Sequence, residues 1–355
     1  MFVSVSAKPA RDLLPTGILF QTAWWSAVKR RLGSIPLAAD YRSPAARGDL
    51  LVITRPIADG ISMAHVPYGP EWGPDTEQRG PFLEALSESL RAYLPPSVAF
   101  IRFDLPWDSA YADDPRWQAS DGLRQPEPWV AEMRMNWGTR SRALRKAPTD
   151  VLVTDTIEID LNATNDQLLA AMKPKTRYNI RLAARSGIRV ELAGADRLHE
   201  FYELYRATAR RNGFAAQGYE HFAAMFATPR TKLDELTVVL LLASYRREVT
   251  AAAIVSLCRD RATYLFGASS DEHRERMASY AIQWTAIRIA RSRGCTSYDL
   301  YGIAPTHQLH PLAGVRRFKA GFGGRVVHRA GSWDFPLDSI AYERFRAHEL
   351  VQGGP

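Results

Sequence analysis

The chain has 355 residues and 46% of them are hydrophobic, which is enough apolar material for one large or two medium-sized domains. No run reaches the ~18 consecutive apolar residues that a membrane-spanning helix needs, and residues 1–15 lack the basic flank and apolar centre of a secretory signal. The two cysteines, Cys258 and Cys295, do not form a disulfide framework, and no metal-ligand spacing is present. We therefore expect a cytoplasmic protein without a metal.

The net charge is +8, and most of the basic residues are arginine. Four basic clusters stand out along the chain, at 29–31, 140–146, 173–189 and 316–319. A single cluster of this kind is usually a solvated helix face. Four together favour an anionic partner, such as a phosphate group, tRNA or the acidic face of a membrane. We expect no binding to DNA.

The predicted elements alternate between helix and strand along the chain. Apolar residues recur with helical spacing in eight segments: 20–32, 81–94, 165–172, 176–186, 197–211, 219–227, 279–293 and 340–350. Strand-like runs occupy nine segments: 50–56, 62–66, 98–103, 156–161, 189–192, 237–245, 250–258, 262–268 and 297–300. This order, with hairpin-like runs in the middle, predicts a mixed α and β fold (α/β in the broad sense).

The stretch 104–150 differs from the rest of the chain. It is rich in Trp, Pro, Asp and Arg and has weak periodicity, so we interpret it as a long connecting region. The order of elements before it is partly repeated after it, which indicates two similar domains. Its basic part, 131–148, carries Met133, Met135 and Trp137 at alternate positions. This part is compatible with a solvated loop, a tRNA approach or contact with anionic lipid.

The second half of the chain has the layout of an acetyltransferase. Two long strands, 237–245 and 250–258, lead to a third and then, through a polar loop, to a helix that begins near Ser279. In acetyltransferases that bind coenzyme A, glycines in that loop offer backbone amides to the pyrophosphate at the helix N-terminus. Here 271–279 reads DEHRERMAS, with three acids and no glycine. We therefore expect the layout without this cofactor.

The segment 314–324, GVRRFKAGFGG, follows a strand that looks buried. Lys319 stands beside Phe318, and the glycines around it let the backbone approach a ligand closely. Lys319 is therefore a candidate electrostatic anchor. The alternative is the basic end of a helix that Gly321 caps. This segment alone does not separate the two interpretations.

Four separated segments together resemble the Fem family of aminoacyl-tRNA-dependent peptidyltransferases. They are QTAWWSAVKRRLG at 21–33, MKPKTRYNIRLAARSGIRV at 172–190, YLFGASS at 264–270, and the run from 280 to FKAGFGG at 318–324. The resemblance extends from residue 21 to about residue 336. The basic helix and the Phe-Lys-containing segment are specific in combination, whereas either alone would be weak.

The resemblance implies two tandem acetyltransferase-like (GNAT-like) domains with a cleft between them. The first is expected to hold residues 1–154, with 325–355 folding back onto it, and the second residues 155–324. Some family members carry a coiled-coil arm in the second domain. The region 197–234 has neither the length nor the heptads for such an arm, so we expect the armless form.

The family's activity is the transfer of an amino acid from aminoacyl-tRNA to the side-chain amine of residue three of a peptidoglycan precursor stem peptide. The resemblance thus implies an aminoacyltransferase with aminoacyl-tRNA as co-substrate and no cofactor. Its acceptor would be a lipid-linked or UDP-linked muramyl pentapeptide containing lysine or ornithine, and peripheral contact with an anionic membrane at the inner face fits this role. A Fem-like transferase with another peptide acceptor and a catalytically silent binding homologue stay open as alternatives.

The resemblance also assigns catalytic residues. Lys319, with Phe318 before it, matches the family's catalytic segment, where a fixed cation would stabilise the oxyanion of the tetrahedral intermediate. Asp104 matches an acid discussed in the family as a base. A carboxylate with a pKa near ~4 is a poor base for an ammonium near ~10, so we expect Asp104 to position the amine by a hydrogen bond.

The remaining assignments concern substrate binding. Lys29 matches the lysine that contacts the diphosphate of the precursor, and Arg211 is the second phosphate candidate, with Arg210 as its alternative. Arginine suits this task because its planar fork can bind two phosphate oxygens at once. Tyr264 would line the cleft and bond to the substrate peptide, although a strand tyrosine also suits a core position.

Overall fold

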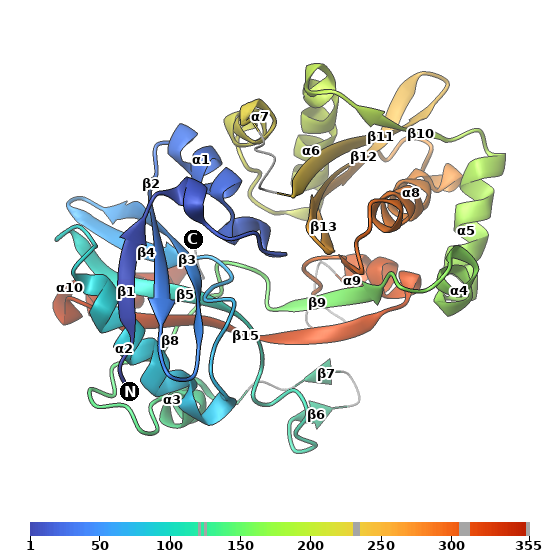
Figure 1. The fold of residues 1–355 in the computed structure, drawn as a ribbon. Coiled ribbons are helices and arrows are strands. Elements are labelled where there is room, and N and C mark those ends of the chain that lie inside the picture. Colours follow the sequence, from blue (N-terminus) through green and yellow to red (C-terminus); the bar gives the residue numbers. More distant parts are fainter. Residues whose placement is uncertain (120–121, 124–125, 230–234, 305–312, 353–355) are drawn as a thin grey trace. The chain divides into compact units, whose positions relative to one another are not determined.

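The computed structural model describes residues 1–119, 122–123, 126–229, 235–304 and 313–352 (Figure 1). The chain divides into two units. Unit 1 comprises Met1–Leu14, Phe20–Thr154 and His328–Pro355, and unit 2 comprises Pro15–Leu19 and Asp155–Val327. Each unit is built on a twisted, mainly antiparallel sheet with helices packed on it, and each has an apolar core of its own.

The sheet of unit 1 has the strand order β1-β2-β3-β4-β5-β15, and β8 pairs with β15. Its neighbours are antiparallel except for β4 and β5, which run parallel. The strands are β1 (Ser4–Lys8), β2 (Ile35–Arg42), β3 (Arg47–Ala58), β4 (Ile61–Val66), β5 (Val98–Asp108), β8 (Arg145–Lys146) and β15 (Arg325–Pro336).

The helices of unit 1 are α1 (Ala23–Arg31), α2 (Arg79–Arg91), α3 (Pro128–Met135) and α10 (Ser339–Gln352). Helix α1 begins where the Thr22 hydroxyl accepts a hydrogen bond from the Trp25 backbone N–H at 3.1 Å, an N-cap that satisfies one of the free donors of the first turn. Helix α2 contributes Phe82, Leu83 and Leu86 to the main core of the unit. Helix α10 packs Tyr342 edge-on against Phe100 of β5.

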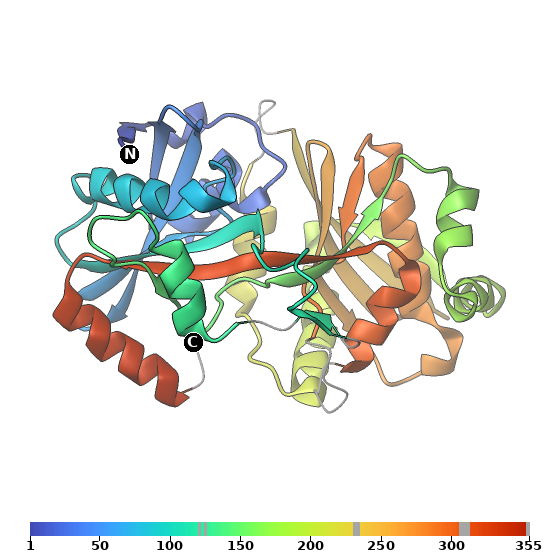
Figure 2. The same cartoon turned by 90° about the horizontal axis from the view of Figure 1, so that it is seen from below.

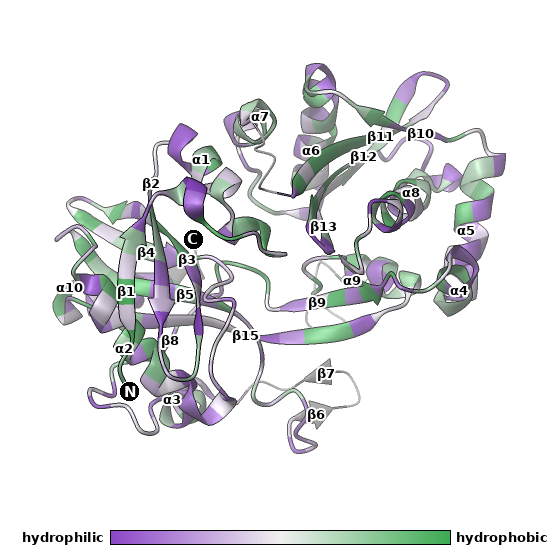
Figure 3. Ribbon diagram, in the orientation of Figure 1, coloured by the Kyte–Doolittle hydropathy of each residue, from purple (hydrophilic) through white to green (hydrophobic). Residues whose placement is uncertain are grey.

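The sheet of unit 2 has the strand order β9-β14-β13-β12-β11-β10, with β13 and β14 parallel and the other neighbours antiparallel. Strands β11 and β12 are among its most hydrophobic segments (Figure 3). The strands are β9 (Asp155–Asp160), β10 (Arg189–Ala193), β11 (Leu236–Tyr245), β12 (Glu248–Cys258), β13 (Arg261–Ser269) and β14 (Ser297–Asp299).

The helices of unit 2 are α4 (Asn165–Ala171), α5 (Pro174–Arg185), α6 (Leu198–Asn212), α7 (Tyr219–Ala227), α8 (Ala278–Ser292) and α9 (Ala313–Lys319). Helices α5 and α8 share one apolar core with the sheet. Helices α6 and α7 meet the sheet through a separate aromatic cluster in which the rings of Phe222 and Phe266 are 5.0 Å apart. Helices α6 and α7 have 15 and 9 residues, so the described part of 198–227 contains no long arm.

The predicted helices and strands are all present, and the mixed α and β class is confirmed. The interpretation of 104–150 as a connecting region is wrong at both of its ends: β5 continues to Asp108, and α3 and β8 follow. Pro106 lies within β5 beside an irregularity in the pairing of β5 with β15, a position at which a strand tolerates proline. The strands β1 and β2 were not predicted. The C-terminal strand β15 was expected only from the family resemblance, and α9 only as the alternative interpretation of the segment 314–324.

Candidate functional site

Lys319 is the last residue of α9, and its side chain is almost completely buried, with 7% of the residue exposed. Its Nζ donates hydrogen bonds to the backbone carbonyl oxygens of Gly302 at 2.6 Å and Tyr301 at 3.3 Å. Tyr301 has a left-handed backbone conformation, with φ of 59°, just after the end of β14. A turn after a strand therefore presents two carbonyls to one ammonium and fixes its place.

The electrostatics of this lysine follow from its burial. Burial lowers the pKa of Lys319 to about 8, and the nearby Asp299 carboxylate opposes part of this shift. Asp299 itself accepts a hydrogen bond from the Tyr301 backbone N–H at 2.7 Å and another from the Thr156 hydroxyl. The ammonium is thus charged near neutral pH, but little water shields its charge.

Phe318 does not point at the same partners as Lys319. Its ring lies 5.0 Å from that of Tyr280 and 5.2 Å from that of Phe322, both in edge-on geometry. These contacts attach α9 to α8 and to the core of unit 2. Phe318 therefore orients the helix that carries Lys319.

Gly321 is not a helix cap, which corrects the alternative interpretation of this segment. The left-handed glycines are Gly323 and Gly324, with φ of 84° and 89°. Gly321 lies in the short turn Ala320–Phe322, where a Cβ atom would stand 2.3 Å from the Thr176 hydroxyl of α5. Its carbonyl accepts a hydrogen bond from the Lys173 backbone N–H at 2.9 Å. The start of α5 is therefore held against the turn that follows Lys319.

Tyr264 lies on β13 beside this lysine, with its ring centre 5.6 Å from Lys319 Nζ. Burial raises the pKa of Tyr264 to about 12, so its hydroxyl stays protonated at neutral pH and can donate a hydrogen bond. A Cβ atom at Gly267 would come within 1.6 Å of that hydroxyl, so the glycine makes room for the tyrosine. The sequence-predicted pair Tyr264 and Lys319 is brought together in unit 2.

Arg211, near the C-terminal end of α6, is also in unit 2 but is already engaged. Its guanidinium donates to the carbonyl oxygen of Ser269 at 2.9 Å and to the Ser269 hydroxyl at 3.1 Å. It also forms an ion pair with Asp271 at 3.3 Å. Contact with a phosphate would require this arginine to exchange at least one of these partners.

Unit 1 contains two neighbouring cations, Lys29 on α1 and Arg55 on β3. Burial and the charge of Arg55 lower the pKa of Lys29, whose Nζ lies 4.9 Å from the centre of the Trp25 ring. Burial also lowers the pKa of Arg55, and its Nε is buried without a hydrogen-bond partner among the described residues. Two partly buried cations that repel each other would be stabilised by an anion.

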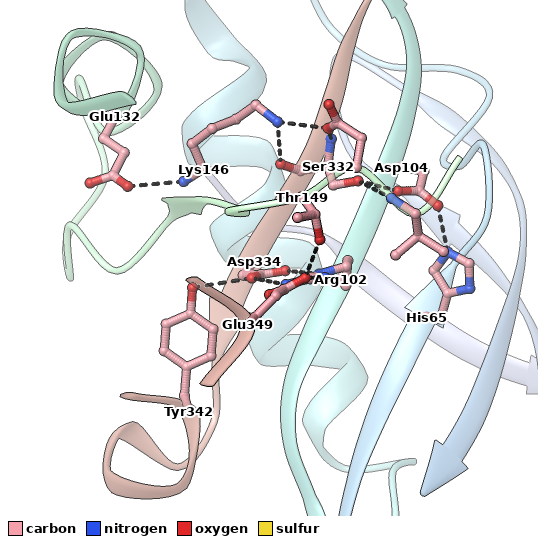
Figure 4. A network of polar contacts seen from close by, with 12 residues as sticks. His65, Arg102, Asp104, Glu132, Lys146, Thr149, Ser332, Asp334, Tyr342 and Glu349 are labelled. Atoms are coloured by element: carbon pink, nitrogen blue, oxygen red, sulfur yellow. Dashed lines mark hydrogen bonds and ion pairs between the residues drawn. The ribbon is translucent and has the colours of Figure 1, made fainter. Parts of the chain in front are cut away.

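Asp104 is buried within β5, with 2% of the residue exposed, and both carboxylate oxygens are occupied (Figure 4). One faces His65 Nε2 at 2.5 Å, and the other accepts a hydrogen bond from the Ser332 hydroxyl. Burial alone would raise the pKa of Asp104, but His65 and Ser332 bring it below its usual value. This geometry favours a permanently ionised carboxylate that orients its neighbours.

A second buried network lies beside Asp104 on the same strand (Figure 4). Arg102 donates to both carboxylate oxygens of Asp334 at 2.7 Å and to those of Glu349 at 2.7 and 2.8 Å. Tyr342 adds a hydrogen bond to Asp334 at 3.1 Å. The network fixes β15 and α10 to β5, since an unpaired buried charge would be costly.

Sequence reasoning missed Arg55, His65, Ser332 and Asp299. Arg55 had a usable signal, because it interrupts the apolar run LLVIT of β3 with a charge. The other three gave none, since their partners come from distant parts of the chain. Thr156, for example, meets Asp299 only because β9 pairs with β14.

The described residues do not suit a pyrophosphate at the start of α8, where coenzyme A would bind in an acetyltransferase. The exposed acids Asp271 and Glu275 precede the helix, and His273 and Met277 have left-handed backbones. Within the described ranges, no group of three or more His, Cys, Asp or Glu side chains could hold a metal ion. In the same part of the chain, no helix has the length and hydrophobicity to cross a membrane.

Comparison with known proteins identifies the family of this chain and proteins of similar fold. The FemAB family profile matches residues 14–240 and 230–349. A lipid II:glycine glycyltransferase of Staphylococcus aureus (strain MSSA476) is 21% identical over 248 residues, covering 52% of this chain and 59% of that protein. Glycyltransferases of the same description from strains MRSA252 and MW2 match equally. The chain thus spans about three-fifths of the length of these relatives.

Solved structures show the same architecture. The crystal structure of FemX superposes with a TM-score of 0.71 at 16% identity, covering 95% of this chain and 96% of that one. A tandem GNAT protein from the clavulanic acid biosynthesis pathway superposes with a TM-score of 0.51 at 12% identity, covering 94% and 98%. The expected acetyltransferase-like fold is confirmed. Together with the profile match over most of its length, this shows that the chain belongs to the FemAB family.

Proposed function

We propose that this protein is an aminoacyltransferase that starts the interpeptide bridge of peptidoglycan. It would move an amino acid from aminoacyl-tRNA to the side-chain amine of residue three, lysine or ornithine, of the precursor stem peptide. FemAB membership and the names of the staphylococcal relatives support this reaction class. The observation that carries the proposal is Lys319, a buried ammonium held by two carbonyl oxygens beside the ring of Tyr264.

The chemistry that this arrangement can support is attack of an amine on an ester. The amine nitrogen forms a bond to the carbonyl carbon of the aminoacyl group, and the resulting tetrahedral intermediate carries an oxyanion. The Lys319 ammonium would stabilise that charge, an effect of about 3 kcal/mol for a comparable donor in other enzymes. The carbon–oxygen bond to the tRNA ribose then breaks, and the ribose oxygen takes up the proton that the amine loses.

Binding of the precursor would involve the cations of unit 1. We assign Lys29 to the diphosphate of the precursor, and the unpartnered Nε of Arg55 next to it supports an anion at this place. Arg211 remains the proposed second phosphate ligand in unit 2. Asp104 would act through His65, because its own oxygens are occupied.

The test is a transfer assay with a mixture of charged tRNAs and a lysine- or ornithine-containing precursor, in lipid-linked and UDP-linked form, read by mass spectrometry. The proposal expects a mass increase of one aminoacyl residue that depends on charged tRNA and disappears in Lys319→Met. No increase with any donor and acceptor, or an equal increase with Lys319→Met, would contradict it.

A further inference from the structure

Helix α3 and the turn that follows it, residues 136–138, carry three large apolar side chains on the surface of unit 1. Trp129 is 62% exposed, Met133 66% and Trp137 76%. Trp129 and Met133 are four residues apart on α3 and so lie on one face of the helix, and Trp137 follows in the turn just after the C-cap Asn136. We call Trp129, Met133 and Trp137 the α3 ridge. In Figure 2, α3 is the green helix on the near face of unit 1, next to the red helix α10.

The rest of this segment is firmly packed, so the exposure of the ridge is not a sign of local disorder. Ala131 and Leu144 are buried in the core of the unit. The Asn136 side chain donates hydrogen bonds to the carbonyl oxygens of Glu132 at 2.9 Å and Leu144 at 2.8 Å, and it accepts one from the Leu144 backbone N–H at 3.1 Å. The fold thus holds the helix in place with its apolar ridge turned to the solvent.

Positive charge follows the ridge directly. Arg140 and Arg142 are exposed, Arg145 is half-buried, and in the described part of the chain none of the three has an ion pair. The Glu84 carboxylate accepts hydrogen bonds from the backbone N–H groups of Arg140 and Ser141 rather than from an arginine side chain. By contrast, Arg134 within the helix is paired with Glu77 at 2.7 Å. The charges of Arg140 and Arg142 are therefore available to an external anion, whereas Arg145 Nη1 already donates to the carbonyl oxygens of Arg142 at 2.7 Å and Leu144 at 3.1 Å.

We propose that the α3 ridge and its arginines dock unit 1 onto the surface of a bilayer that contains anionic phospholipids. Tryptophan is enriched at the boundary between headgroups and acyl chains, and a methionine between two tryptophans extends the apolar contact. Arginines beside such a ridge are attracted to acidic headgroups. An RNA partner fits less well, because the central Met133 offers no ring on which a base can stack.

This inference does not depend on the aminoacyl transfer proposed above. It assigns the protein to the membrane surface, where it would meet a lipid-linked acceptor by diffusion in two dimensions. The test therefore uses binding rather than transfer, so that each can fail separately.

The experiment is flotation of the full-length chain with vesicles of phosphatidylcholine alone or with about one-third phosphatidylglycerol. We expect binding to the acidic vesicles that weakens as salt rises. In the double variant Trp129→Ser/Trp137→Ser, and in Arg140→Gln/Arg142→Gln, it should fall by about tenfold or more. Trp72→Ser is the matched control, because Trp72 is also 62% exposed but lies in another segment of unit 1. It should bind like the unchanged protein.

A second readout is the quenching of tryptophan fluorescence by brominated lipid, which should be lost with the ridge tryptophans and kept in Trp72→Ser. Met133→Ser is available if the double variant does not fold, as judged by circular dichroism. Absence of binding to acidic vesicles at low salt, or equal binding of all variants, would overturn the proposal. So would loss of tRNA binding or of self-association in the ridge variants while vesicle binding is retained.

Discussion

Lys319 combines two properties that rarely occur together, a charge and near-complete burial. The two carbonyls that hold it supply partial negative charge without neutralising it, so its field can act on a neighbouring oxyanion. A carboxylate partner in direct contact would have cancelled that field. The arrangement therefore stabilises the ammonium and still leaves it available to a developing negative charge.

Substitution of this residue tests its role. We expect Lys319→Met to lower the single-turnover transfer rate by about two orders of magnitude or more, with little change in binding of charged tRNA or precursor. Lys319→Arg should restore only part of the rate, since a planar guanidinium cannot place its charge where the compact ammonium lies. Loss of activity through loss of tRNA binding would show that Lys319 is not the catalytic cation.

The lowered pKa of Lys319 also predicts how stability varies with pH. The unfolded chain binds a proton at this lysine up to about pH 10.5, whereas the folded chain releases it at about pH 8. Between these values the unfolded state binds more protons, so the free energy of unfolding rises with pH in that window. Urea titrations should therefore show Lys319→Met more stable than the unchanged protein at pH 7, with the difference shrinking toward pH 10.5.

Lys29 tests the anion site of unit 1. Lys29→Ala should raise the KM for the diphosphate-bearing precursor about tenfold or more, because charge-assisted contacts contribute roughly 1.5–3 kcal/mol. An acceptor peptide without the diphosphate should be used as well as before. Arg30→Ala, an exposed neighbour on α1, is the control. Equal losses on both acceptors would mean that Lys29 serves the fold or the tRNA.

At the scale of elements, the start of α5 is hydrogen-bonded to the turn that follows Lys319. The helix begins at Pro174, held through Gly321 to the turn after the lysine, and its sequence PKTRYNIRLAAR contains no acid. Twelve residues extend about 18 Å. Arg181 and Arg185 are exposed along it, and Tyr178 is 55% exposed. We propose that these exposed residues bind the phosphate backbone of the tRNA while its aminoacylated end lies at Lys319.

We expect Arg181→Glu/Arg185→Glu to raise the KM for charged tRNA and to reduce the salt dependence of its binding, with kcat nearly unchanged. A short aminoacylated dinucleotide, which cannot span the helix, should be used equally well by the variant and the unchanged protein. Arg288→Glu/Arg293→Glu, a similar reversal of exposed charges on α8 and at its C-cap, is the control. Impaired use of the dinucleotide would place the effect at the reaction centre.

The elements that the sequence predicted are those with a clear apolar period. The strand β15, RVVHRAGSWDFP, has no such period, because Arg329 and Asp334 are buried charges within it. Charged residues at buried positions hide the alternation of apolar and polar residues by which a strand is recognised in a sequence. The same reason explains the missed site residues: His65, Ser332 and Asp299 acquire their roles from partners far away in the sequence. Lys319 and Tyr264 were predicted, because the family resemblance marked them.

At the scale of the whole molecule, the network around Arg102 decides whether the C-terminal elements stay attached to unit 1. Arg102→Met would leave the carboxylates of Asp334 and Glu349 buried without their partner. We expect a loss of about 3–5 kcal/mol in the free energy of unfolding, and faster amide exchange in α10. Tyr342→Phe, which removes one hydrogen bond, should cost only about 1 kcal/mol. Unchanged stability of Arg102→Met would contradict this role.

The division of the chain between the units has a consequence for its synthesis. Apart from Pro15–Leu19, unit 2 is the continuous stretch Asp155–Val327, so all of it is synthesised before His328–Pro355, the last part of unit 1. The N-terminal part of unit 1 must wait for β15 and α10, roughly 9–35 s at usual elongation rates. During that time Arg102 lacks both of its carboxylates. We therefore expect the incomplete unit 1 to bind chaperones during synthesis. A stop codon just before His328 would leave unit 2 complete but would remove the C-terminal part of unit 1.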